Sequence, residues 1–383
     1  MAQNSNSTNK HQLDFNGAKI QETPEEQNPS ILLPNQPTNI QLFSLDIGGS
    51  LIKLAYFSRD EELLNDGDQR DHPVLGGVLR FVKFERNHLD ECLDFIQSRL
   101  LGKGMVESSV ENARIRATGG GAYAFGDIFK ERLDVTVENV DELDSVVSGA
   151  NFLLQNVPNE AYRRSERRSA FISIDRNDLF PYLLVIVGTS VALNMVTGDG
   201  EFKLITGTNL GGGTISGLAR FLTGCESFDD FIELSQKGDS HALDLTIGDI
   251  YGGIGYPKVD FPSTTVAASF GKVGFKSKLY DYKAEDIAAS LSNSFTCNIT
   301  HISYLVAKLT GVRRIIFGGS YIRGVASVMD NISNLIGHWS QGQVQAIFFR
   351  HEGFLGAIGA LLVNGNLKFV KTSIHNFTKE VNE

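Results

Sequence analysis

The sequence LDIGGSLIK, residues 45–53, contains the feature that decides the fold. It has the pattern of an apolar strand, a turn of small residues, and a second apolar strand, which is typical of a tight β-hairpin. A similar stretch, VIVGTSVAL, spans residues 185–193. One such hairpin is common. Because there are two, each at the start of one half of the chain, we expect an internal duplication of α/β domains.

Strands and helices are mixed after both hairpins. Apolar residues at helical spacing predict three helices, and short runs of β-branched and aromatic residues predict four strands. The helices are expected at 88–101, 142–154 and 284–309, and the strands at 79–84, 115–118, 202–206 and 314–317. Two similar halves of this kind predict sheets with helices packed on them.

The N-terminal segment has a different composition from the rest. Pro24, Pro29, Pro34 and Pro37 lie among Asn, Gln and Ser with few apolar residues, so burial cannot offset the entropy of ordering. We therefore expect a disordered tail at residues 1–39 and a polar tail at residues 371–383. Between them, the hairpins predict a first α/β domain at 40–175 and a second at 176–370.

Composition excludes several classes of function. The 383 residues are 42% hydrophobic and 21% charged, as in ordinary globular proteins. The 35 Lys and Arg against 45 Asp and Glu give a net charge of −10, which argues against nucleic acid as a partner. Cys92, Cys225 and Cys297 share no CxxC spacing, which argues against a disulfide scaffold or structural zinc. We find no export signal and no membrane-spanning run, so we expect a cytoplasmic protein.

Glycine clusters are the strongest local signal for chemistry. In the first hairpin, glycines let the backbone approach a phosphate, Asp46 could hold Mg²⁺, and Lys53 could contact a phosphate oxygen. Alone, this hairpin could equally be a simple tight turn. Three more clusters, at 118–121, 207–214 and 318–319, follow expected strands or precede helices, where amides and the helix dipole attract anions. Together they favour nucleotide binding.

The acidic segment Asp141-Glu142-Leu143-Asp144 opens an expected helix. One interpretation is structural, because acids in the first turn complement the helix dipole. The other is catalytic, with one carboxylate acting as the general base that accepts a proton from a substrate hydroxyl. The residues alone leave both interpretations open.

Five motifs in order resemble the eukaryotic (type II) pantothenate kinases, and plant members most. They are DIGGSLIK (46–53), ATGGGAY (117–123), TGTNLGGGT (206–214), GDIYGG (248–253) and HEGFLGA (351–357). The resemblance implies the actin-like ATPase fold of acetate kinases, sugar kinases and heat-shock ATPases, with two duplicated halves around a nucleotide cleft. It also implies a homodimer that uses MgATP to phosphorylate pantothenate to 4′-phosphopantothenate, the first step of coenzyme A synthesis. Feedback inhibition by coenzyme A or its acyl thioesters is implied as well.

The resemblance also implies roles for individual residues. Glu142 matches the catalytic base, and Asp46 the metal ligand. The residues that match ATP- and phosphate-binding positions are Asp46, Gly48, Gly49, Ser50, Lys53, Gly188, Thr189, Ser190, Gly211, Gly212, Gly213 and Thr214, with Gly318 and Gly319 in the loop near adenosine. The residues that match substrate-binding positions are Thr189, Ala192, Leu204, Ala267 and Trp339, and the last two match residues lent by the partner subunit.

The chain departs from the family pattern at three of these positions. Ser190 replaces a glycine, Ala192 replaces a serine, and Leu204 replaces the arginine that holds the carboxylate of pantothenate. Loss of a charge-assisted contact predicts a decrease of roughly 10–150-fold in catalytic efficiency. An alternative is therefore a catalytically impaired member that binds nucleotide or acyl-CoA and regulates an active partner. A sugar or acetate kinase on the same fold rests on fold analogy alone.

Overall fold

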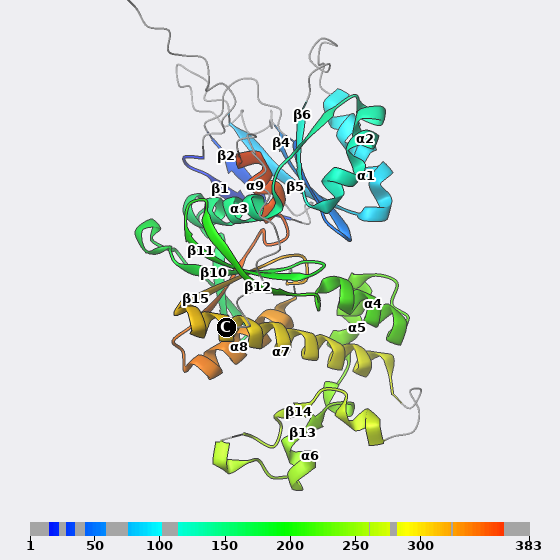
Figure 1. Ribbon diagram of the computed structural model, residues 1–383, viewed down its shortest axis with the longest axis vertical. Coiled ribbons are helices and arrows are strands. Elements are labelled where there is room, and N and C mark those ends of the chain that lie inside the picture. The colour runs from blue at the N-terminus through cyan, green and yellow to red at the C-terminus, as the bar shows by residue number, and fades with distance from the viewer. Residues whose placement is uncertain are drawn as a thin grey trace, which may run out of the picture.

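Two seven-stranded sheets, one in each half of the molecule, organise the chain (Figure 1). The computed structural model describes residues 15–22, 28–34, 43–58, 76–101, 114–259, 261–275, 282–322 and 325–363. Within these ranges the first sheet has the strand order β1-β2-β5-β4-β3-β6-β7, and the second has the order β12-β11-β10-β15-β16-β8-β9. A short pair, β13 and β14, lies apart from both sheets.

The elements have the following bounds. The strands of the first sheet are β1 (Lys19–Gln21), β2 (Ser30–Leu33), β3 (Phe43–Ile47), β4 (Leu51–Ser58), β5 (Gly77–Glu85), β6 (Arg114–Thr118) and β7 (Thr136–Asn139). The remaining strands are β8 (Ala161–Ser165), β9 (Arg168–Phe171), β10 (Tyr182–Val187), β11 (Val191–Gly198), β12 (Glu201–Thr208), β13 (Leu245–Thr246), β14 (Val266–Ala268), β15 (Arg314–Gly318) and β16 (Gln345–Phe349). The helices are α1 (Leu89–Leu101), α2 (Gly120–Leu133), α3 (Glu142–Asn156), α4 (Gly212–Thr223), α5 (Phe228–Lys237), α6 (Ile247–Tyr251), α7 (Ala284–Thr310), α8 (Ala326–Ser340) and α9 (Leu355–Leu362). The three helices and four strands expected from the sequence are confirmed.

The two sheets share one topology. In the first sheet, β3 pairs antiparallel with β4 and parallel with β6, and β6 continues parallel to β7. In the second sheet, β10 pairs antiparallel with β11 and parallel with β15, and β15 continues parallel to β16. The strand that follows each hairpin, β5 or β12, pairs antiparallel with the second strand of that hairpin. This correspondence confirms the predicted α/β class with two duplicated halves.

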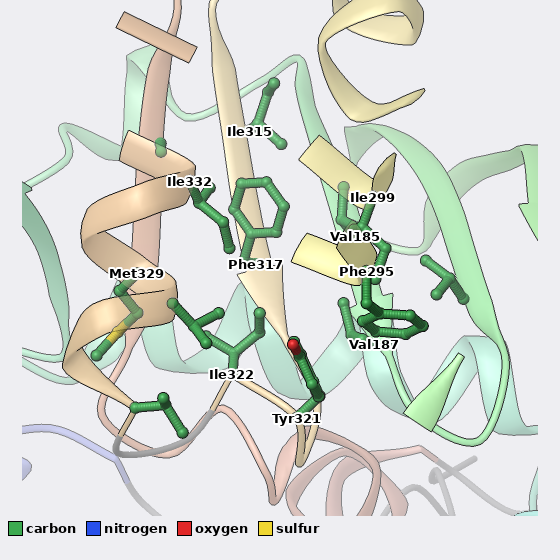
Figure 2. Close-up of a cluster of buried hydrophobic side chains, with 14 of the residues drawn as sticks. Val185, Val187, Phe295, Ile299, Ile315, Phe317, Tyr321, Ile322, Met329 and Ile332 are labelled. Carbon is green, nitrogen blue, oxygen red and sulfur yellow. The ribbon is translucent and has the colours of Figure 1, made fainter. Parts of the chain in front are cut away.

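The core of the second half lies between its sheet and two helices (Figure 2). Val185 and Phe317 on neighbouring strands contact apolar side chains of α7 on one side and α8 on the other. The face of α7 expected from its periodicity is the buried one, with Phe295 and Ile299 both less than 10% exposed. Burial of large apolar side chains contributes about 1.5–3 kcal/mol each, so this layer rigidly supports the ends of β10 and β15.

Helices α3 and α9 pack against each other between the two sheets (Figure 1). Helix α9 also contacts β3, β4 and β6, and the Ser44 hydroxyl donates a hydrogen bond of 2.6 Å to the carbonyl of Ala357. Helix α3 reaches the second sheet, where the Asn151 amide donates to the carbonyl of Gly198 at 3.4 Å. The helix pair therefore couples the two halves, and it places the N-terminus of α3 near β3.

The expectation of a disordered tail over residues 1–39 is wrong for part of that segment. Strands β1 and β2 pair with each other, and β2 pairs with β5, where Ile31 and Leu33 are fully buried. The physical reason is that the short aliphatic run Ser30–Leu33 completes an edge of the first sheet, and this outweighs the polar composition around it. Residues 1–14, 23–27 and 35–42, and the expected tail at 371–383, lie outside the described residues.

The predicted boundary between residues 175 and 176 does not divide the sheets. Strand β8 precedes it but pairs with β16 of the second sheet, and α9 from the end of the chain packs on the first sheet. The pattern of apolar residues indicates local secondary structure, but it does not show which distant segment joins a given sheet. The sequence therefore could not predict that β8 joins the second sheet and that α9 packs on the first. Within the described ranges, no helix has both the length and the apolar character needed to cross a membrane.

Candidate functional site

Asp46 and Lys53 form an ion pair at the end of the first hairpin. The two residues are direct partners across β3 and β4, so their side chains lie on the same face. Lys53 Nζ donates to Asp46 Oδ2 at 2.8 Å, and the two side chains are only 15% and 11% exposed. Space for the carboxylate depends on two glycines, because a Cβ at Gly119 would lie 3.1 Å from Oδ1 and one at Gly356 would lie 2.9 Å from Oδ2.

Glu142, the first residue of α3, is electrostatically coupled to this ion pair. Burial raises the pKa of Glu142, the negative charge of Asp46 raises it further, Lys53 lowers it, and Asp141 raises it. Asp141 instead caps α3, where its Oδ1 accepts hydrogen bonds from the amides of Leu143 and Asp144 at 2.9 and 3.0 Å. The acidic segment therefore contains one structural carboxylate and one whose pKa depends on both members of the ion pair.

The turns of the two hairpins lie against each other where the two halves of the molecule meet. A Cβ at Gly49 would lie 2.7 Å from Thr189 Oγ1, so the first turn lies directly against the second. Within the described residues, the amides of Gly49 and Ser50 have no hydrogen-bond partner. The backbone at Ser190 does not have a positive φ, so serine causes no backbone strain there. Two amide-bearing turns in apposition, one with free amides, are suited to binding an anion.

The other glycine clusters have different geometry. The amides of Gly212 and Gly213 donate to the carbonyls of Gly188 and Thr189 at 2.7 and 3.0 Å, and a Cβ at Gly211 would overlap with Thr189. This loop therefore positions the second turn, and its committed amides are not free for a phosphate. Thr214 Oγ1 likewise donates to a backbone carbonyl, that of Asn209, at 2.8 Å.

Gly318 and Gly319 connect β15 to the segment before α8. Gly319 has a φ of 101°, and its amide donates to the carbonyl of Glu352 at 2.8 Å. Ser320, the next residue, lines a cavity of about 660 Å³. Its walls include Phe228 and Ile232 of α5 together with Tyr162 and Phe171 of the β8–β9 hairpin. The cavity is thus separate from the ion pair but begins beside the glycine loop.

The residues expected to bind substrate are not all brought together. Ala192 lies in β11, five residues beyond the end of β10, and Leu204 lies on the edge strand β12, where it is 48% exposed. Ala267 is exposed in β14, which Figure 1 places at the end of the molecule remote from α3. Trp339 lies at the end of α8, where its ring packs near His301 and Tyr304. In a single chain Ala267 therefore lies remote from α3, and the ring contacts of Trp339 are with residues of α7.

One feature of this region was not recognised in the sequence. Arg86, after β5, donates from Nη1 to the carbonyl of Gly48 at 3.2 Å, a contact that no local pattern signals. His351, a weaker candidate for chemistry within one of the quoted motifs, is fully buried and contacts Glu160 Oε2 at 2.7 Å and the carbonyl of Pro29 at 2.7 Å. This contact joins the loop after β16 to the N-terminal segment, so its role is structural.

Metal ligands are few in this site. The part of the chain that the structure describes contains no cluster of three or more His, Cys, Asp or Glu residues able to hold a metal. Asp46 offers one carboxylate, and Mg²⁺ is typically held by one or two carboxylates together with substrate phosphates. The donor set therefore fits a metal that arrives with a nucleotide.

Comparison with known proteins shows the family of the chain. The sequence profile of the family described as Fumble matches residues 42–363. Pantothenate kinase 1 of Arabidopsis thaliana is 45% identical over 329 residues, which cover 85% of this chain and 86% of that protein. The chain belongs to the Fumble family of pantothenate kinases. Among the described residues, the ion pair, Glu142 and the apposed turns all lie within the matched range.

Other family members are longer than this chain. Pantothenate kinase 2 of Arabidopsis thaliana is 50% identical over 374 residues, which cover 92% of this chain but 42% of that protein. The chain thus spans less than half the length of this relative. Among solved structures, a glucokinase from Balamuthia mandrillaris in complex with glucose has a TM-score of 0.42 and 12% identity, covering 84% of this chain and 92% of that chain.

Proposed function

We propose that the chain is a pantothenate kinase that transfers a phosphoryl group from MgATP to the primary hydroxyl of pantothenate. One observation carries the proposal: Glu142 is electrostatically coupled to the Asp46–Lys53 pair, which lies at a hairpin turn where, among the described residues, the amides of Gly49 and Ser50 have no hydrogen-bond partner. A general base, a cation and an anion-binding turn are the groups that phosphoryl transfer to an alcohol requires.

The proposed reaction assigns one task to each of these groups. The hydroxyl oxygen of pantothenate forms a bond to the γ-phosphorus of ATP, and the bond between that phosphorus and the bridging oxygen of ADP breaks. Glu142 accepts the hydroxyl proton, and ADP leaves. Lys53 and the amides of Gly49 and Ser50 stabilise charge on the phosphates. Mg²⁺, held by Asp46 and the phosphates, would supply further charge neutralisation.

The cavity beside Ser320 suits the adenosine end of the nucleotide. Its aromatic and aliphatic walls, Phe228, Phe171 and Ile232, can pack on a planar base. Asp229 and Glu233 add carboxylates that can accept hydrogen bonds from an exocyclic amine. We therefore assign adenine to this cavity and the phosphates to the apposed turns.

The assembly and its control are part of the same proposal. Ala267 and Trp339 reach a substrate site only if a second copy supplies them, so we propose a homodimer. Inhibition by coenzyme A or its acyl thioesters rests on the family resemblance alone, and a cytoplasmic location stays a prediction from the sequence.

The activity is tested directly with isotope-labelled pantothenate and MgATP. We expect phosphopantothenate to form, and no product above background at millimolar substrate would overturn the proposal. The alternative, an impaired member that regulates an active partner, is favoured by Ser190, Ala192 and Leu204. Turnover of the unmodified chain at an ordinary rate of roughly 1–10 s⁻¹ would exclude it.

Leu204→Arg is expected to lower KM for pantothenate by about tenfold, because a guanidinium forms a charge-assisted contact with the substrate carboxylate. Leu204 is 48% exposed, so the new charge need not be buried. Steady-state kinetics with varied pantothenate measures the change. Leu218→Arg, on an exposed leucine of α4, is the matched control. An unchanged KM in Leu204→Arg would show that this position does not contact the carboxylate.

The activity should also depend on pH through Glu142. Its ordinary pKa of 4.5 is raised, so the base loses its charge, and kcat/KM falls, as pH decreases through that raised value. Asp141→Asn removes one charge that raises this pKa while keeping an oxygen to cap α3. We therefore expect the acid limb of the pH profile of kcat/KM to move to lower pH. A limb that stays in place in Asp141→Asn would contradict the assignment of Glu142 as the base.

A further inference from the structure

Arg86 lies against the first hairpin turn from outside the glycine motif. Its guanidinium Nη1 donates to the carbonyl of Gly48 at 3.2 Å, and its backbone amide donates to the carbonyl of Ser50 at 2.9 Å. The guanidinium carbon also lies 5.1 Å from the centre of the Phe125 ring, a cation–π distance. Two contacts with the β3–β4 turn and one with α2 thus hold this partly buried arginine, which follows the end of β5.

Among the residues that the structure describes, none neutralises the charge of Arg86. In the described ranges it contacts no carboxylate, whereas the nearby Lys53 is paired with Asp46 at 2.8 Å. Glu142 adds a further negative charge beside that lysine. A guanidinium has five N–H donors, and the contacts above occupy a donor on Nη1 only. Among the described residues at this turn, the cation that contacts no carboxylate is therefore the arginine, and most of its N–H donors have no hydrogen-bond partner among these residues.

We propose that Arg86 is a phosphate-binding residue of the nucleotide site, and that it also positions the turn. This inference rests on the proposed function. A triphosphate at the turn meets two carboxylates, Asp46 and Glu142, and one lysine that is already paired. Arg86 supplies the missing positive charge in a geometry that suits bidentate contact with phosphate oxygens.

The test is nucleotide binding to the full chain by calorimetry, with MgATP, MgADP and adenosine as probes. For Arg86→Gln, which can retain a hydrogen bond but not the charge, we expect the Kd of MgATP to rise by about tenfold or more. For Arg86→Lys, which retains the charge, we expect a smaller rise. The Kd of adenosine should not change in either variant. Arg99→Ala removes an arginine that packs on Tyr56 and Phe95 away from the turn, and it is the matched control.

The outcomes separate this inference from the proposed function. If the unmodified chain does not bind MgATP, both are wrong. If it binds MgATP, and Arg86→Gln binds it equally well, Arg86 has no role in phosphate binding while the kinase proposal stands. Equal weakening by the Gln and Lys variants, or equal weakening for adenosine, would show a structural role only. Thermal unfolding of each variant confirms that the protein tested is folded.

Discussion

Glu142→Gln is expected to lower kcat for phosphoryl transfer to pantothenate by about 10²–10⁴-fold, the usual contribution of a general base. Glutamine is nearly isosteric and can keep α3 in place, but it cannot accept the hydroxyl proton. The affinity for MgATP should fall little, or increase slightly, because a negative charge near the phosphates is removed. Steady-state kinetics gives kcat, and calorimetry with MgATP gives the binding constant.

Asp144→Asn is the matched control for this variant. Asp144 lies in the same first turn of α3, and its backbone amide rather than its carboxylate makes the capping contact with Asp141. Its loss of charge should leave kcat close to that of the parent chain. Comparable kcat values for Glu142→Gln and the parent would show that another group accepts the proton, even if the chain is a kinase.

The acidic segment illustrates how far sequence could go. Asp141, Glu142 and Asp144 are equivalent by composition, and all three satisfy the dipole at a helix N-terminus. Family resemblance selected Glu142, but the physical reason is geometric. The side chain of Asp141 accepts hydrogen bonds from two amides of α3, whereas Glu142 is the residue whose pKa both Asp46 and Lys53 shift. Capping patterns alone cannot decide which carboxylate remains uncommitted.

The glycine clusters divide in the same way. Gly48 and Gly49 belong to the first turn, where, among the described residues, the amides of Gly49 and Ser50 have no hydrogen-bond partner, and anion binding there stays a prediction. Gly211–Gly213 match a nucleotide-binding loop by position, yet two of their amides are committed to the second turn. In the sequence, a glycine that permits close backbone packing cannot be told from one that binds phosphate. Only the hydrogen-bond partners of their amides distinguish the two.

The packing of segments that are far apart in the chain could not be predicted from the sequence. Strand β2 joins an edge of the first sheet, and α9 returns from the end of the chain to contact α3 and β3. Both depend on contacts between residues far apart in the chain, which local periodicity does not encode. The packing of α3 against α9 is the most extensive of these contacts among the described elements. Substitution of the glycines between the two helices should therefore change the stability of the fold.

Gly359→Ala is expected to destabilise the fold by about 3 kcal/mol, at the upper end of the usual cost of overpacking. A Cβ at Gly359 would overlap with the backbone carbonyl of Ser145 in α3, and one at Gly149 of α3 would overlap with the carbonyl of Leu355. Since both obstacles are backbone atoms inside helices, no side chain can move to relieve the clash. The midpoint of unfolding in urea, followed by circular dichroism, measures the loss.

Gly126→Ala is the control, because it should change the free energy of unfolding in the opposite direction. Gly126 lies inside α2, and a Cβ there would have no neighbour within 4 Å. This substitution should therefore stabilise the fold by about 0.5–1 kcal/mol, the usual gain from replacing glycine within a helix. Gly149→Ala should behave like Gly359→Ala. If Gly359→Ala and Gly126→Ala both stabilise the fold, the backbones of α3 and α9 are not in direct contact. The packing of α9 would then not explain the position of α3, which carries Glu142.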